Sequence, residues 1–278
     1  MRTRRPAPSG QAVPKTPIAG APHRRPVPNR QDRLMPQRWD PGRPLLDMSP
    51  GRWLQERLWT WGPGSNRQGL AVGSLVPEGF EAYARVLHPA TSETERGFES
   101  VRWSVIASWT GRTVHPLMQF HRIADLPAFP GHRAPKWGFV PSEGEMPSAE
   151  GERLVAILRA HTATPDRCYL GLWEGYGAPE LNALAKLPRL MLPHRAYFLF
   201  SGPIDAVTSM RVGGFQHPPN LWWPEDRAWC VASEIDLSET YLAASEACVT
   251  QVTRDPGLEA YPVPLEGRVD VDGDLINR

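Results

Sequence analysis

The sequence predicts an α+β fold: a mostly antiparallel sheet with packed helices, preceded by a disordered Pro/Arg-rich tail. Three observations support this prediction. Four segments have the alternating or apolar pattern of strands, at residues 168–174, 195–200, 228–236 and 258–263. Helical patterns lie between some of these strands, as expected where helices pack on an antiparallel sheet. The first fifty residues hold 11 of the 31 prolines and few large apolar side chains.

Residues 1–50 form the predicted tail. Their ten basic residues outnumber three aspartates, which gives a net charge of +7 and leaves −6 for residues 51–278, because the whole chain carries +1. Such a segment cannot bury enough apolar surface to offset the entropy lost on ordering. The favoured interpretation is a linker, or an over-extended start before Met35 or Met48. The alternative is a nucleic-acid or partner-binding arm, which predicts salt-sensitive DNA binding that deletion of residues 1–50 abolishes.

Residues 51–278 are expected to be a single α+β domain. It begins with a short amphipathic helix or turn near Trp53, which a glycine-rich segment ends. A strand follows at residues 80–87. Residues 126–148 are rich in proline and glycine and are predicted to be a long loop at the rim of a pocket, with Trp137 at its centre.

The segment between that strand and that loop is ambiguous in its periodicity. Residues 101–109 alternate as in a strand, although Ile106 breaks the alternation and keeps a helix open. Residues 115–123 are predicted to continue as a second strand-like piece. His88, His115 and His121 are close in sequence, but their spacing fits no metal-ligand set, so no metal site is expected.

Two helices are predicted in the C-terminal half. Ser148 is the expected N-cap of a helix to His161, with acidic residues in its first turn and an apolar stripe that includes His161. A second helix is expected at residues 245–253. The final strand, residues 258–263, is expected at an edge because it contains Pro262.

The stretch at residues 216–237 combines tryptophans, prolines, a cysteine and acidic groups, and we expect the domain to be organised around it. Its prolines argue against helix or central strand before residue 227. Trp222 and Trp223 are therefore predicted to form a lid over one end of the sheet. Their indole N–H groups would need partners if buried, and Glu225 and Asp226 are nearby in sequence.

Chemical motifs are weak in this chain. Cys168, Cys230 and Cys248 are odd in number, which favours free thiols in a reducing compartment. Cys230 is the candidate nucleophile, but its neighbours are expected to raise the thiol pKa, so a buried structural role is favoured. The pair Glu234 and Asp236 fits acid–base chemistry less well than a solvated edge.

No cofactor motif is present, and the acidic run at residues 270–274 lacks the glycine and the distal glutamate of a calcium loop. No apolar run reaches transmembrane length, and no hydrophobic segment follows the basic N-terminus. The expectation is a cytoplasmic protein with no cofactor and no membrane partner.

Three segments carry a resemblance: residues 76–89, 167–177 and 221–236. Together they resemble a family of proteins of unknown activity from high-GC Gram-positive bacteria, over roughly residues 70–265. The resemblance implies no activity and supplies no catalytic residue.

Two hypotheses follow. The favoured one is a non-enzymatic binding protein whose proline-held aromatic loops engage a protein partner. Its candidate contact residues are Trp222, Trp223, Glu225, Asp226, Trp137 and His217. The alternative is a hydrolase or transferase that uses Cys230 or His217 with nearby carboxylates.

Overall fold

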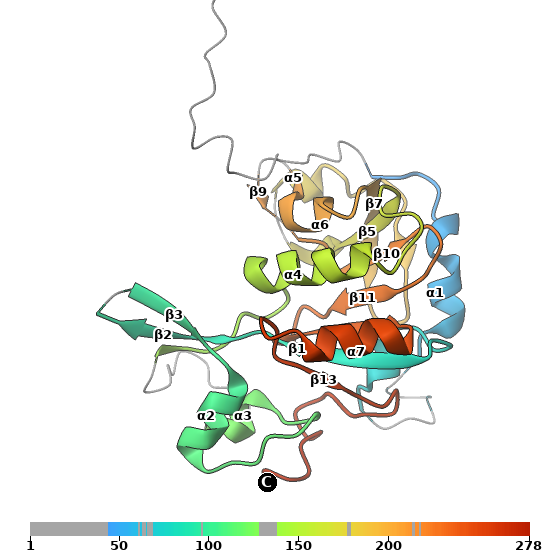
Figure 1. The fold of residues 1–278 in the computed structure, drawn as a ribbon. Coiled ribbons are helices and arrows are strands. Elements are labelled where there is room, and N and C mark those ends of the chain that lie inside the picture. The colour runs from blue at the N-terminus through green and yellow to red at the C-terminus, as the bar shows by residue number, and fades with distance from the viewer. Residues whose placement is uncertain are drawn as a thin grey trace, which may run out of the picture. The chain divides into compact units, whose positions relative to one another are not determined.

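The computed structural model describes residues 44–278 except 61, 63–64, 66–68, 96, 128–137, 177–178, 213–214 and 217 (Figure 1). Trp137 and His217 lie outside the described residues. All described residues belong to one compact unit, residues 37–278. Its ordered part begins before residue 50: the Leu45 N–H donates to Leu199 O at 2.6 Å, and a 3-10 helix, η1, spans Ser49–Gly51. Residues 44–50, assigned from the sequence to the tail, therefore pack with the domain.

The centre of the fold is an eight-stranded sheet in the order β13-β1-β12-β11-β10-β5-β7-β6. Every neighbouring pair is antiparallel, which confirms the predicted fold class. The bounds are β1 (Ala82–Leu87), β5 (Cys168–Trp173), β6 (Leu190–Met191), β7 (Ala196–Gly202), β10 (Leu221–Pro224), β11 (Cys230–Ser233), β12 (Glu239–Ala244) and β13 (Ala260–Pro262).

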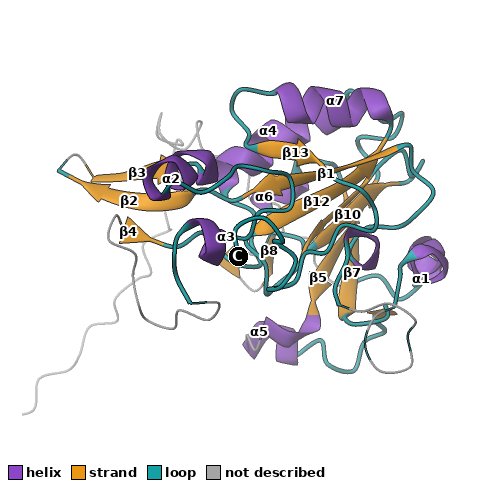
Figure 2. Cartoon of the chain, turned by 90° about the horizontal axis from the view of Figure 1, so that it is seen from below, coloured by secondary structure: helices purple, strands orange, loops and turns teal. Residues whose placement is uncertain are grey.

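Each face of the sheet has its own hydrophobic core. Helices α4 (Ser148–Arg159), α6 (Ala206–Ser209) and α7 (Glu246–Arg254) cover one face (Figure 2). The other face packs against α1 (Arg52–Arg57), the 3-10 helix η2 (Val72–Ser74) and residues 263–269. Alternate residues of each strand supply the two cores, because successive side chains in a strand point to opposite faces.

The two predicted helices of the C-terminal half are confirmed as α4 and α7. Ser245 caps α7, since its Oγ accepts from the Cys248 N–H at 3.3 Å. The expected cap of α4 is wrong: Pro147 occupies the N-cap position, and Ser148 is already helical. The helix ends at Arg159, and His161 lies beyond it with its Nε2 2.8 Å from Gln251 Oε1.

The strand expected at residues 101–109 is wrong, and the helical alternative is right: Trp103–Thr110 form α2. The Glu259 carboxylate accepts from the Trp103 and Ser104 N–H groups at 2.6 and 2.8 Å, so a residue far away in sequence satisfies the first turn. Residues 115–123 are not a strand either. They form a turn and a short helix, α3 (Phe120–Ile123).

A smaller sheet extends from the main body in the order β3-β2-β4 (Figure 1). Its strands are β2 (Ala90–Thr94), β3 (Gly97–Val101) and β4 (Gly138–Phe139). The remaining elements are η3 (Glu174–Tyr176), α5 (Pro179–Asn182), and the pair β8 (Arg211–Val212) and β9 (Phe215–Gln216).

Candidate functional site

The structure places Trp222 and Trp223 inside the domain, so the predicted lid is wrong. Both side chains are 0% exposed and belong to β10, a central strand. As neighbours in one strand they point to opposite faces, one into each core. Pro224 is the last residue of β10 and pairs with Cys168 of β5. The pairing of β10 with β11 has already ended at this position, so a residue without an N–H group is tolerated there.

The two acidic residues beside these tryptophans serve other partners. Glu225 pairs with Arg167 at 2.5 Å at the surface. Asp226 accepts from the Thr162 hydroxyl and from the Ala163 N–H at 2.7 Å, which ties two turns together. The Trp222 and Trp223 indole nitrogens have no hydrogen-bond partner in the described part of the chain. The four described candidate contact residues therefore do not form a common surface.

Cys230 is fully buried in β11, and burial raises the pKa of its thiol. This environment opposes thiolate formation and does not support a nucleophile. Glu234 and Asp236 do not share a strand face, since β11 ends at Ser233. Both carboxylates bind Arg195: Nε donates to Glu234 at 2.9 Å, and an Nη donates to Asp236 at 2.7 Å. The side chain of Glu234 is 11% exposed and that of Asp236 is 73% exposed, so a solvated edge describes only Asp236.

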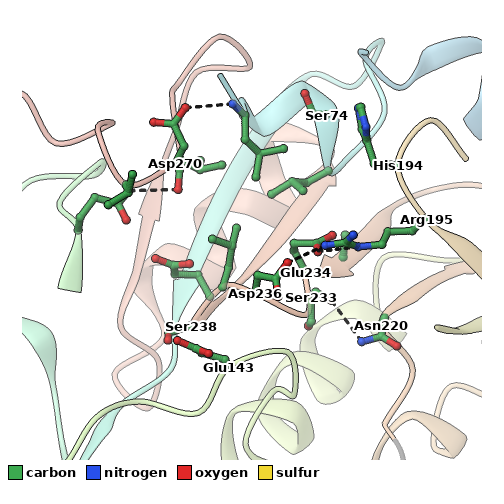
Figure 3. A pocket seen from close by; sticks show the side chains of 18 of the residues that line it. Ser74, Glu143, His194, Arg195, Asn220, Ser233, Glu234, Asp236, Ser238 and Asp270 are labelled. Carbon is green, nitrogen blue, oxygen red and sulfur yellow. Dashed lines mark hydrogen bonds and ion pairs between the residues drawn. The ribbon is translucent and has the colours of Figure 1, made fainter. Parts of the chain in front are cut away.

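A cavity of about 610 Å³ lies on the sheet face that carries α1 and η2 (Figure 3). Its lining includes residues of the turn between β11 and β12, of the loop at residues 140–147, and of α3. Its wall is largely apolar and includes Leu58, Leu70, Leu75, Phe120, Leu192 and Leu237. Its polar lining includes five carboxylates, those of Glu143, Glu234, Asp236, Glu239 and Asp270.

Glu143 reaches the cavity because its loop lies directly on the β11–β12 turn. The Gly144 N–H donates to Leu237 O at 2.9 Å. Gly144 has φ of 75°, and a Cβ there would lie 2.9 Å from Ile235 O, so this close approach requires glycine. Figure 3 shows the Glu143 side chain beside Ser238.

A polar network fixes the same loop to the sheet. His88 Nδ1 lies 2.9 Å from Ser142 O, and its Nε2 lies 2.9 Å from Thr240 Oγ1, which in turn contacts Ser233 Oγ at 2.7 Å. Since a carbonyl only accepts, Nδ1 carries the proton and Nε2 accepts from Thr240. Burial lowers the pKa of His88 to about 4, which keeps the imidazole neutral.

Asn220 is the second anchor of the loop. Its amide nitrogen donates to Tyr176 Oη at 2.7 Å and to Gly144 O at 3.3 Å, while its oxygen accepts from the Trp173 N–H at 3.0 Å. The residue is buried and lines the cavity. The loop, β5 and β10 are thereby held in one geometry, so the position of Glu143 is largely preformed.

Glu239 forms the buried end of the site. One carboxylate oxygen pairs with Arg85, and the side chains of the pair are 0% and 3% exposed. Arg85 also donates to the carbonyls of Pro116 and Met118, at 3.0 and 2.7 Å. Glu239 Oε2 is buried without a hydrogen-bond partner among the described residues, as is the Ser74 Oγ on the cavity lining.

Two histidines also line the cavity, His121 and His194. Burial and a neighbouring arginine lower the pKa of each, which favours neutral imidazoles. His88, His115 and His121 do not converge: His115 binds Asp274 at 2.9 Å, and within the described ranges no three His, Cys, Asp or Glu side chains group closely enough to hold a metal ion. No helix of the described chain has the length and apolar character to cross a membrane.

The sequence reasoning missed Glu143, Glu239 and Asn220. Glu143 lies within the predicted pocket rim, and its proximity to Gly144 was the available signal. Glu239 begins β12, a strand that was not predicted, and its partner Arg85 is 154 positions away. Comparisons of the chain with family models, with curated proteins and with solved structures found no match.

Proposed function

We propose that this chain is a non-enzymatic binding protein and that recognition takes place in the cavity beside the β11–β12 turn. The observation that carries the proposal is the cavity itself. Its volume of about 610 Å³ falls within the usual range of small-ligand sites, roughly 300–1,000 Å³. A largely apolar wall with a few convergent polar groups is also typical of such sites.

Trp222 and Trp223 are buried, so we do not propose that aromatic loops bind the partner. A partner docked on the surface cannot reach either indole without opening the sheet. The cavity, in contrast, has polar atoms that the fold leaves unpaired, at Ser74 Oγ and Glu239 Oε2. Unpaired buried polar groups are costly, and a ligand or water that hydrogen-bonds them offsets that cost.

The hydrolase or transferase alternative has less support. Its described nucleophile, Cys230, has a buried thiol with a raised pKa. Its carboxylate Glu234 is committed to Arg195. Binding therefore accounts for the described site better than thiol chemistry does.

The test uses the full-length protein and two matched variants. Val140 lines the cavity and is 39% exposed, whereas Val105 lies on α2, is 40% exposed and does not line it. Saturation-transfer NMR with a library of small organic fragments should detect binders of the wild-type chain. Val140→Trp should abolish most of these signals, and Val105→Trp should leave them unchanged. A library without binders, or binders insensitive to Val140→Trp, would contradict the proposal.

A further inference from the structure

The charge of the cavity indicates which ligands it selects. Five carboxylates line the cavity, and three arginines form ion pairs with some of them: Arg85, Arg195 and Arg268. Five negative and three positive charges leave a net charge of −2 around the cavity. Arg195, the lining arginine, is shared between Glu234 and Asp236, so it is already neutralised before an anion could bind.

Glu143 is the lining carboxylate for which no ion pair is found among the described residues. Partial burial and the negative charges of Asp236 and Glu239 raise the pKa of its carboxyl group. All three acidic residues line the cavity, and their charges are near enough to influence one another. A positive charge placed there would be attracted by all three.

Glu239 gives an independent indication of a ligand. The residue is 2% exposed, it lines the cavity, and its Oε2 has no donor in the described part of the structure. Arg85 occupies only the other oxygen. A buried carboxylate oxygen is normally satisfied, and a donor entering from the cavity would complete it.

From these observations we infer that the cavity selects organic cations, with an ammonium or guanidinium group held by Glu143 and by Oε2 of Glu239. The body of the ligand is apolar and lies against the wall formed by Leu70, Leu75 and Leu192. The inference rests on the proposed binding function and specifies the ligand class of the same site. Charge-assisted hydrogen bonds to two carboxylates, in a partly desolvated cavity, provide the selectivity.

Matched ligands separate charge from shape. Tryptamine, tryptophol and indole-3-propionate share an indolylethyl body and end in a cation, an alcohol and an anion. Octylamine, octanol and nonanoate share an octyl body and make the same comparison with a linear chain. Binding of each set to the full-length chain is measured by isothermal titration calorimetry. In each set we expect the cation to bind about tenfold more tightly than the alcohol, and the anion to bind most weakly.

Glu143→Gln removes the unpaired carboxylate, and Glu145→Gln removes the same charge from the same loop outside the cavity lining. The cation should lose about tenfold in affinity for the Glu143→Gln variant and little for the Glu145→Gln variant. Equal or tighter binding of the alcohol or anion by the wild-type chain would overturn the cation inference and leave the binding function standing. Failure of all six compounds would overturn the cation inference, and an NMR screen that also finds no binders would overturn the binding function as well.

Discussion

The buried pair of Arg85 and Glu239 supports a quantitative prediction about stability. Arg85→Met removes the cation and leaves the Glu239 carboxylate buried, with the carbonyls of Pro116 and Met118 also losing their donor. Breaking a buried ion pair on one side costs about 3–5 kcal/mol, because the remaining charge is uncompensated. For a domain of this size that corresponds to a fall in Tm of about 6–20 °C.

The assay is urea unfolding followed by tryptophan fluorescence, with the exposed pair Arg167–Glu225 as the control. Its side chains are 68% and 41% exposed, so Arg167→Met should cost less than about 1 kcal/mol. Adding Glu239→Leu to Arg85→Met should restore part of the loss, since the orphaned charge is then removed. If Arg85→Met were as mild as Arg167→Met, the pair would not be desolvated in solution, and the reasoning would be refuted.

Two further predictions concern His88 and the thiols. The pKa of His88 is about 4 in the folded chain and near 6.5 in the unfolded chain. Below pH 6.5 the unfolded chain therefore binds a proton at His88 that the folded chain does not bind. The free energy of unfolding should fall by about 3 kcal/mol as the pH drops from 6.5 to 4. Denaturant titrations across this range should show that the free energy of unfolding depends less on pH for His88→Gln than for the wild-type chain. An equal pH dependence for the two chains would contradict the lowered pKa of His88. Burial raises the pKa of Cys168 and Cys248 to about 12 and raises that of Cys230 as well, so all three should react with a thiol reagent only at the rate of unfolding. Rapid labelling of one thiol in the native protein, counted by mass spectrometry, would revive the nucleophile hypothesis.

The parts of the fold that local patterns determine were predictable. The apolar run at residues 195–200 corresponds to β7, and the stripe after Ser148 corresponds to α4. The helix expected at residues 245–253 corresponds to α7, although its cap at Ser245 was not predicted. These elements carry their own periodicity, so distant partners were not needed to recognise them.

The errors arise where distant residues override the local pattern. Trp103–Thr110 alternate as a strand would, yet Glu259 satisfies the first turn of a helix there. The prolines around Trp222 and Trp223 argued against a central strand, but Pro224 falls where the pairing with β11 has already ended. Burial within a sheet depends on strand order, which the local sequence does not specify.

The candidate site was only partly predictable for the same reason. The loop at residues 126–148 was expected at a pocket rim, and Pro141 and Glu143 do line the cavity. The pairing of Arg85 with Glu239 joins strands β1 and β12, and only the register of that pairing brings the two side chains together. A single sequence without strand order cannot reveal such a pair.

The opposed orientation of Trp222 and Trp223 makes the protein its own optical reporter. The ring centroids of Trp222 and Trp229 lie 5.1 Å apart, edge to face, in the layer beneath α4 and α7. Those of Trp223 and Trp53 lie 6.2 Å apart in the layer on the other face of the sheet. The chain has 11 tryptophans, so the signal of one layer is the difference between the emission of the wild-type chain and that of a Trp222→Phe or Trp223→Phe variant. This difference follows loosening of the layer beside the cavity separately from melting of the layer beneath α4 and α7.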